Sequence, residues 1–282
     1  MGNIWKTGIL MALLTILLIF IGRLIGGTQG AVFAFAFALL INFVAYWFSD
    51  KIVLGMYGGK EVSAEQSPEL YGIVQNLAGS MGLPMPRVYV IPAPSPNAFA
   101  TGRNPQHSAV AVTEGSLRIL NKQELEAVIA HELAHIKHRD TLIATVVAAL
   151  AGAVTLLARI AGMSAFYGGR DEENRGGGAI LLLVYLLAPL AALLIQLAIS
   201  RSREYMADEG SARATRKPMN LASALKKLVE YTKQVPLPAE PSTAHMFIVN
   251  PFSGGGFTAM FSTHPPIEKR IERLGELARQ LG

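Results

Sequence analysis

Four long apolar segments restrict the fold of this chain more than any other feature of its sequence. Residues 7–27 contain a single charge, Arg23, and residues 30–48, 141–158 and 176–200 contain none. A helix needs about 20 apolar residues to cross the hydrocarbon core of a bilayer, and all four segments reach or approach that length. The sequence therefore predicts about four transmembrane helices, at 7–27, 30–48, 141–160 and 178–200.

Two of these segments have an alternative explanation. Residues 7–27 could be a cleaved signal peptide, but no small-residue cleavage site precedes polar sequence, and a second apolar segment follows within three residues. Residues 141–160 are short enough to be a buried core helix. The composition favours a membrane protein, because only 16% of the residues are charged, against about 25% in soluble domains.

Basic residues near the segment ends predict the orientation of the chain. Five of them follow the fourth segment between positions 201 and 217, whereas the three arginines of 159–175 are offset by three acidic residues. We therefore expect both termini and both larger polar parts to face the cytoplasm. The expected divisions are a membrane hairpin at 1–48, a first polar part at 49–140, a second hairpin at 141–200 and a second polar part at 201–282.

The polar parts show the patterns of a small α+β domain. Ser67-Pro68-Glu69 begins a helix, and strand-like runs follow at 87–91, 97–101 and 108–113. Asn121 and Glu124 form a capping box that opens a helix expected to run through residue 140 into the third span. Two amphipathic helices, separated by a Pro/Gly-rich segment at 235–266, complete the chain.

A histidine motif lies in the capped helix. His131 and His135 are four residues apart, so they share a helical face, about 6 Å apart at Cβ, and can bind one metal ion. Glu132 can reach a metal-bound water without binding the metal, as the general base of a zinc peptidase does. This short pattern also occurs by chance. Here, however, it lies on a well-defined helix, and a chain without cysteine has only His and carboxylate ligands for zinc.

A hydrolytic zinc site needs a third protein ligand. His138 faces the same general side as His135, but it is better explained as a polar residue at the membrane edge. Glu204 and Asp208 lie at i and i+4 on a helix that leaves the fourth segment. One carboxylate can bind the metal while the other accepts an imidazole N–H, although both could instead pair with nearby arginines in solvent.

Four motifs, in the same order and with four spans, carry a resemblance that covers essentially the whole chain. They are residues 97–102 (NAFATG), 124–135 (ELEAVIAHELAH), 200–208 (SRSREYMAD) and 263–266 (THPP). They resemble the HtpX-like family of membrane-bound heat-shock zinc peptidases, within the wider CAAX prenyl protease family. The resemblance implies that His131, His135 and Glu204 bind one Zn²⁺ per chain, that Glu132 is catalytic, and that Asp208 matches the aspartate following the ligand.

The fold expected on these grounds is a mainly α membrane protein, with about four transmembrane helices and a cytoplasmic zincin-like α+β protease domain containing a small sheet. Antiparallel packing of spans three and four would return Glu204 to the membrane face that carries His131 and His135. His264 is a candidate donor to the oxyanion of the transition state. It could equally be a gate near the zinc, or simply pack against the last helix.

The short strand before the histidine helix is expected to bind substrate. In related zinc peptidases an edge strand pairs with an extended peptide, which makes Asn97, Ala109, Val110 and Ala111 the candidates here. The resemblance implies an endopeptidase of the bacterial inner membrane that degrades misfolded membrane proteins and unfolded polypeptides under stress. Expected partners are these substrates and the lipid bilayer, and further copies of the chain are a candidate partner.

Two other functions would fit parts of this sequence. A four-span scaffold or channel subunit with structural zinc would not need Glu132. A CAAX-processing enzyme needs a large intramembrane chamber, for which four spans look too few. Nucleic-acid binding is not expected, because no basic stripe interleaved with aromatic residues accompanies the net charge of +5.

Overall fold

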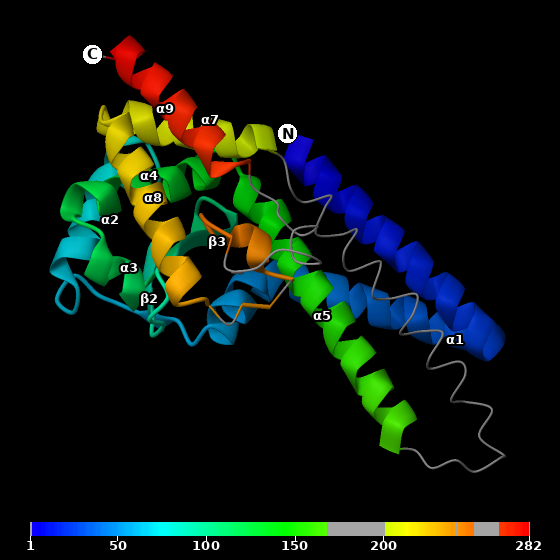
Figure 1. The fold of residues 1–282 in the computed structure, drawn as a ribbon. Helices are drawn as coiled ribbons and strands as arrows, with labels where there is room; N and C mark the ends of the chain where they lie inside the picture. The colour runs from blue at the N-terminus through cyan, green and yellow to red at the C-terminus, as the bar shows by residue number, and fades with distance from the viewer. Residues whose placement is uncertain (1, 168–200, 238, 241, 251–264, 282) are drawn as a thin grey trace.

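The structure is a computed structural model that describes residues 2–167, 201–237, 239–240, 242–250 and 265–281. Most of the described chain is helical, around one small sheet (Figure 1). The elements are α1 (Gly2–Met56), β1 (Lys60–Glu61), α2 (Pro68–Ser80), β2 (Arg87–Ile91), β3 (Ala98–Asn104), β4 (His107–Thr113), α3 (Glu114–Ile119), α4 (Lys122–Lys137), α5 (Asp140–Tyr167), α7 (Arg201–Thr215), α8 (Pro218–Gln234), η1 (Ala244–Met246) and α9 (Ile267–Leu281).

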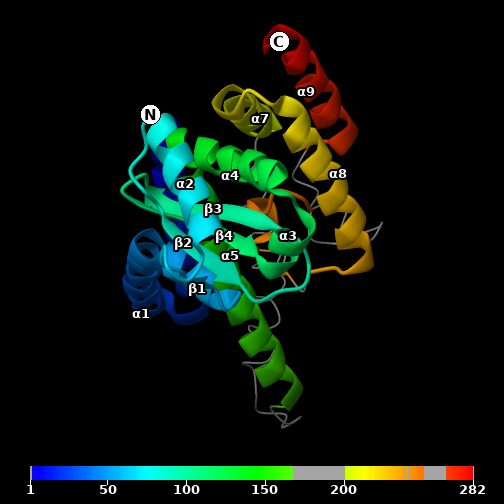
Figure 2. The same ribbon diagram turned by 90° about the vertical axis from the view of Figure 1, so that its left-hand side faces the viewer.

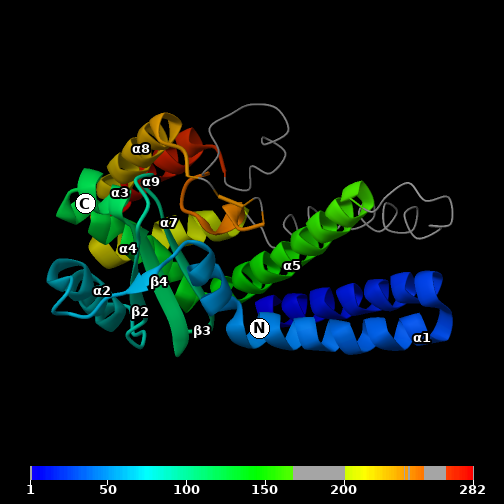
Figure 3. The ribbon, with the colours of Figure 1, turned by 90° about the horizontal axis from the view of Figure 1, so that it is seen from below.

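Element α1 is a hairpin of two apolar helices. Its backbone leaves the helical conformation at Gly26 and Gly27, and Gly27 has a φ of 58°, which L side chains rarely adopt. The two arms, Asn3–Arg23 and Gly26–Met56, are each long and apolar enough to cross a membrane (Figure 3). The first two predicted spans therefore appear as helices, with the turn a few residues earlier than expected.

The third predicted span begins inside the folded domain. The first turns of α5 are buried against α1 and β3, and the apolar stretch Asp140–Thr155 is shorter than either arm of α1. Helix α5 leaves the domain on the same side as the α1 hairpin (Figure 3). The fourth predicted span, at 178–200, lies outside the described residues.

One expectation about the histidine helix is wrong. Helix α4 was expected to run through residue 140, but it ends at Lys137, and α5 begins separately at Asp140. Arg139 has a φ of 59°, in the left-handed region, which breaks the helical path between them. The predicted capping box is present: Asn121 Oδ1 accepts from Glu124 N and Glu124 Oε2 accepts from Asn121 N, each at 2.9 Å.

The sheet has the strand order β1-β2-β4-β3 (Figure 2). Strand β4 pairs parallel with β2 and antiparallel with β3, so it is an interior strand. The expectation that 109–113 forms a substrate-binding edge is therefore wrong. Its backbone groups are hydrogen-bonded on both sides, and Ala109, Val110 and Ala111 are fully buried. Of the described strands, β3 is the edge on that side.

The two faces of the sheet pack against different helices, as the alternation of side chains along a strand requires. Val110 and Val112 belong to the core shared with α2, α4 and α8. Ala109 and Ala111 face the other way, toward Phe99, the end of α1 and α5. The sheet thus joins the domain of α4 to the apolar hairpin.

Candidate metal centre

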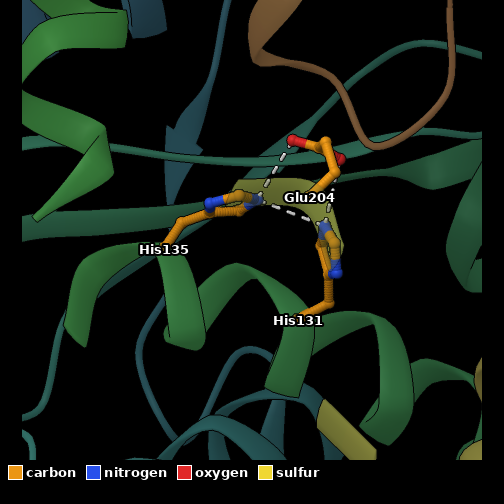
Figure 4. Close-up of side chains that lie close together, drawn as sticks. All are labelled: His131, His135 and Glu204. Carbon is orange, nitrogen blue, oxygen red and sulfur yellow. Dashed lines mark hydrogen bonds and ion pairs between the residues drawn. The ribbon is translucent and has the colours of Figure 1, made fainter. Parts of the chain in front are cut away.

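The histidines of α4 point toward a common point (Figure 4). The Nε2 atoms of His131 and His135 are 3.2 Å apart, and the rings are nearly perpendicular, with centroids 4.8 Å apart. His131 is fully buried, and the side chain of His135 is 15% exposed. The i, i+4 spacing on one helix therefore brings both imidazoles together, as the sequence predicts.

Glu204 of α7 completes a group of three. Its Oε1 lies 3.5 Å from His135 Nε2, and its Oε2 lies 3.7 Å from His131 Nε2 (Figure 4). Close packing of α7 on α4 sets this position. A Cβ at Gly210 would lie only 2.7 Å from the Cβ of Ala134, and Ser211 Oγ donates a 2.7 Å hydrogen bond to the carbonyl of Ala127. Glycine and serine at these two positions let the helices approach.

The spacing of the three donors fits a metal ion. Ligand atoms about 2.1 Å from a tetrahedrally coordinated zinc lie about 3.4 Å apart. The two Nε2 atoms are 3.2 Å apart, and each lies near a different oxygen of the Glu204 carboxylate, at 3.5 and 3.7 Å. Two imidazoles and one carboxylate are also a ligand set of hydrolytic zinc sites. No other group of three such ligands occurs among the residues described.

A buried ion pair lies behind His131. Asp208 Oδ1 is 3.0 Å from His131 Nδ1, so the aspartate can hold the ring by its second nitrogen. Arg270 of α9 binds both oxygens of Asp208, at 2.9 and 2.7 Å, and also donates to the carbonyl of Ile248. Its Nη1 lies 3.6 Å from Glu204 Oε2. One fully buried guanidinium thus contacts two of the carboxylates at the centre.

His135 has its own orienting carboxylate, Asp140. Asp140 Oδ2 is 3.2 Å from His135 Nδ1, and the other oxygen accepts a 2.9 Å hydrogen bond from Asn3 Nδ2. Arg203 Nη1 lies 3.8 Å from the same oxygen. The break at Arg139 places Asp140 beside His135, and the carboxylate links the metal ligand to the first turn of α1.

The buried environment shifts the pKa values of the site. Burial lowers the pKa of His131 to about 4, which favours the neutral imidazole that a metal needs. Burial alone would also lower the pKa of His135, but the hydrogen bond with Asp140 and the nearby glutamates raise it to about 9. Burial raises the pKa of Glu132 to about 7. For Asp208 the burial effect is outweighed by Arg270, which holds that pKa far below its usual value.

Asp140 and Arg270 were not predicted from the sequence. Arg270 was detectable in principle, because it falls on the face of α9 that carries Ile267, Ile271 and Leu274, where a charge is out of place. Asp140 offered no such signal, because its position depends on the break at Arg139.

Asn97 and His138 do not belong to the group of three, and His264 is not among the described residues. Asn97 is fully buried, and its Nδ2 donates to the carbonyl of Val249 at 3.1 Å, so it is not available to substrate. His138 caps the end of α4 and is exposed. His264 lies outside the described residues.

Comparison with known proteins gives the family. Residues 64–278 match the model of peptidase family M48. The chain belongs to family M48. Within M48, a protein named "Protease HtpX homolog" from Pyrococcus furiosus is 57% identical over 283 residues, which cover 99% of this chain and 98% of the relative. A protein of the same name from Thermodesulfovibrio yellowstonii is 57% identical over 277 residues and 98% of both chains.

The M48 assignment makes the chain a metalloprotease of the HtpX type, and the two arms of α1 agree with a membrane protein. A solved structure, Ste24p of S. mikatae, matches 97% of this chain and 67% of its own, with a TM-score of 0.53 and 17% identity. At that identity the likeness concerns the fold alone. The resemblance stated from the sequence is therefore confirmed.

Proposed function

We propose that this M48 protein is a membrane-integrated zinc endopeptidase that cleaves misfolded membrane proteins and unfolded polypeptides at the cytoplasmic face. The observation that carries the proposal is the convergence of two imidazoles and one carboxylate, whose ligand atoms lie within 4.8 Å of one another, with a buried Glu132 next to the first histidine. His131, His135 and Glu204 would hold the ion. Asp208 and Asp140 would each fix one imidazole by its remaining nitrogen.

A zinc ion at these ligands would supply a Lewis acid that polarises the scissile carbonyl and acidifies a water molecule. Glu132 accepts the proton of the attacking water and passes it to the leaving amine. A buried carboxylate suits this exchange, since no bulk water competes for its proton. Arg270 holds the carboxylates of Asp208 and Glu204 in place, and therefore acts through them as a positioning residue.

The substrate strand in this proposal is β3 instead of β4. Strand β3 is the edge of the described sheet on the side of α4, and its residue Ala100 hydrogen-bonds through the backbone to Glu132. An extended peptide added beside β3 would therefore lie next to the proposed base. Backbone pairing of this kind gives weak sequence preference, which suits unfolded substrates.

The topology in this proposal keeps four spans, with both termini and the site cytoplasmic. The divisions are hairpins at 1–48 and 141–200 and a protease domain formed by 49–140 and 201–282. The hydrogen bond from Asn3 to Asp140 supports it, because the start of the first span and the end of the histidine helix then lie at one level. A topology reporter fused after residue 282, or inserted near residue 60, should lie in the cytoplasm. A reporter inserted at 172–175 should lie on the outer side of the membrane. If residue 60 and the C-terminus were found on opposite faces of the membrane, this topology would be wrong.

Activity is tested on the purified full chain, stripped by a chelator and reloaded with Zn²⁺. We expect the reloaded protein to cleave casein and an unfolded membrane protein, and the stripped protein to cleave neither. Glu132→Gln is the matched control, because it keeps the ligand set and folding but cannot accept a proton. Cleavage by this variant at a near wild-type rate would contradict the mechanism.

A further inference from the structure

A groove separate from the metal centre lies where α1 meets the sheet. It is a cavity of about 700 Å³ between the last turns of α1 and the β3–β4 hairpin, and we refer to it as the interfacial groove. Its aromatic wall comes from Phe43, Trp47 and Phe48, and its basic side chains are Lys51, Arg87 and Arg103. The proposed proteolysis uses none of these residues.

The aromatic wall belongs to the apolar arm of α1. The residues Phe43, Trp47 and Phe48 are 56%, 45% and 42% exposed, which is high for large apolar residues. The arm carries no charge from residue 30 to Phe48, and Asp50 and Lys51 follow at once. Aromatic side chains at such a junction are typical of the boundary between hydrocarbon and lipid headgroups. The groove therefore opens at headgroup depth if α1 spans the bilayer.

The basic side chains above this wall carry an excess of positive charge. The lining holds three cations and one carboxylate, Asp50, which is already in an ion pair with Arg87. Among the described residues, no carboxylate lies within 4.0 Å of Lys51 or Arg103. The groove therefore has two cationic side chains available to an anionic ligand.

Both available cations stack on the aromatic wall. The Arg103 guanidinium lies 4.5 Å from the centre of the Trp47 ring and donates one hydrogen bond to the Trp47 carbonyl, at 3.4 Å. Lys51 Nζ lies 5.7 Å from the centre of the Phe48 ring. A guanidinium has five N–H donors, so Arg103 can bind phosphate oxygens without leaving the ring.

We propose that the interfacial groove binds the phosphate headgroup of an anionic phospholipid through Arg103 and Lys51, with the acyl chains against Phe43 and Trp47. Charge complementarity favours an anionic lipid, and the exposed aromatic wall favours a lipid over a soluble phosphate. This inference rests on the proposed membrane placement of α1, but not on the proposed proteolysis.

The test uses the full chain in vesicles and reads tryptophan fluorescence. Trp5→Phe leaves Trp47 as the single tryptophan of the chain. The host lipid of the vesicles is unbrominated phosphatidylcholine. A rising fraction of a brominated lipid, either phosphatidylglycerol or phosphatidylcholine, is added to it. The bromine lies near the headgroup end of the acyl chains and quenches the fluorescence of a tryptophan that touches it. Each cation near a membrane surface raises the affinity for an anionic lipid by a factor of about five. Two cations should therefore favour phosphatidylglycerol over phosphatidylcholine beside Trp47 by about 25-fold.

Two sets of variants decide whether the groove is specific. Arg103→Gln with Lys51→Gln should remove the preference for phosphatidylglycerol. Lys6→Gln should keep it, because Lys6 is an exposed cation near the same end of the hairpin but does not line the groove. An unchanged melting temperature shows that the variants are folded.

Each contrary outcome has its own meaning. Equal quenching of Trp47 by the two lipids would overturn the headgroup site and leave the membrane placement of α1 intact. The same conclusion would follow if Lys6→Gln lost the preference for phosphatidylglycerol as fully as the Arg103 and Lys51 double variant. Relief of quenching by millimolar glycerol phosphate would show a soluble phosphate site instead. No quenching by either lipid would overturn the placement of α1 and the inference with it.

Discussion

Replacing Arg270 by methionine should destabilise the protein strongly. Arg270 is fully buried and binds both oxygens of Asp208, which is itself 2% exposed. Methionine has a similar volume, so the main change is an uncompensated buried carboxylate. Removing one partner of a buried ion pair costs about 3–5 kcal/mol. At about 2–4 °C per kcal/mol for a domain of this size, the melting temperature should fall by about 6–20 °C.

The same variant should weaken the metal site. Asp208 lies 3.0 Å from His131 Nδ1, and an aspartate without Arg270 loses the charge that fixes its position. Loss of an orienting partner of a metal ligand typically costs about 10–100-fold in affinity. The measurements are thermal unfolding of the detergent-solubilised full chain, with and without Zn²⁺, and zinc bound after dialysis against a competing chelator.

Two further variants separate the explanations. Lys269→Met changes a neighbouring exposed cation of α9 and should shift stability by less than about 0.5 kcal/mol. Arg270→Met combined with Asp208→Leu removes both charges, so it should recover most of the stability but not the zinc affinity. If Arg270→Met melted like Lys269→Met, the reasoning about the ion pair would be refuted. If the double variant were as unstable as the single one, the loss would come from packing.

Three further predictions concern other parts of the site and the fold. Glu204→Ala should lower zinc content at least about tenfold, because only two ligands remain; full zinc occupancy by metal analysis would remove Glu204 from the ligand set. Asp140→Asn should lower zinc affinity about 10–100-fold in a chelator titration, through His135; wild-type affinity would show that Asp140 does not orient the imidazole. Burial alone would raise the pKa of Glu124, but the hydrogen bond from Lys227 and the cap of α4 hold it below its ordinary value of 4.5. The stability that Glu124 contributes is thus fully present above that pH and is lost as the pH falls below it. Lys227→Met should flatten this acid-side decrease in melting temperature, and an unchanged slope would contradict the linkage.

The features that depend on local spacing could be predicted from the sequence. The i, i+4 histidines, the Asn121 capping box and the two arms of α1 each follow from patterns within one helix, and the structure contains all of them. Glu204 was also expected near the two histidines, from the two apolar segments that separate it from them in the sequence, and the structure places it there.

Features that depend on tertiary arrangement could not be predicted. The position of Asp140 depends on a left-handed residue at Arg139, and arginine has no preference for that conformation. The placement of β4 inside the sheet depends on a parallel pairing with β2 that no local pattern reports. The role of Arg270 requires the docking of α9 against α7, which joins residues 62 positions apart.

The contact between α9 and α7 bears on the order in which the protein becomes complete during synthesis. Asp208 receives its counter-ion from α9, which is the last described helix of the chain. The ribosome adds about 5–20 residues per second, so the apolar hairpin of α1 emerges long before Arg270 does. Until α9 has been made and docked, Asp208 lacks its arginine, and the helix that carries Glu204 lacks the contact with Arg270. We therefore expect the metal centre to be completed only after α9 has been made, and so later than the apolar hairpin of α1.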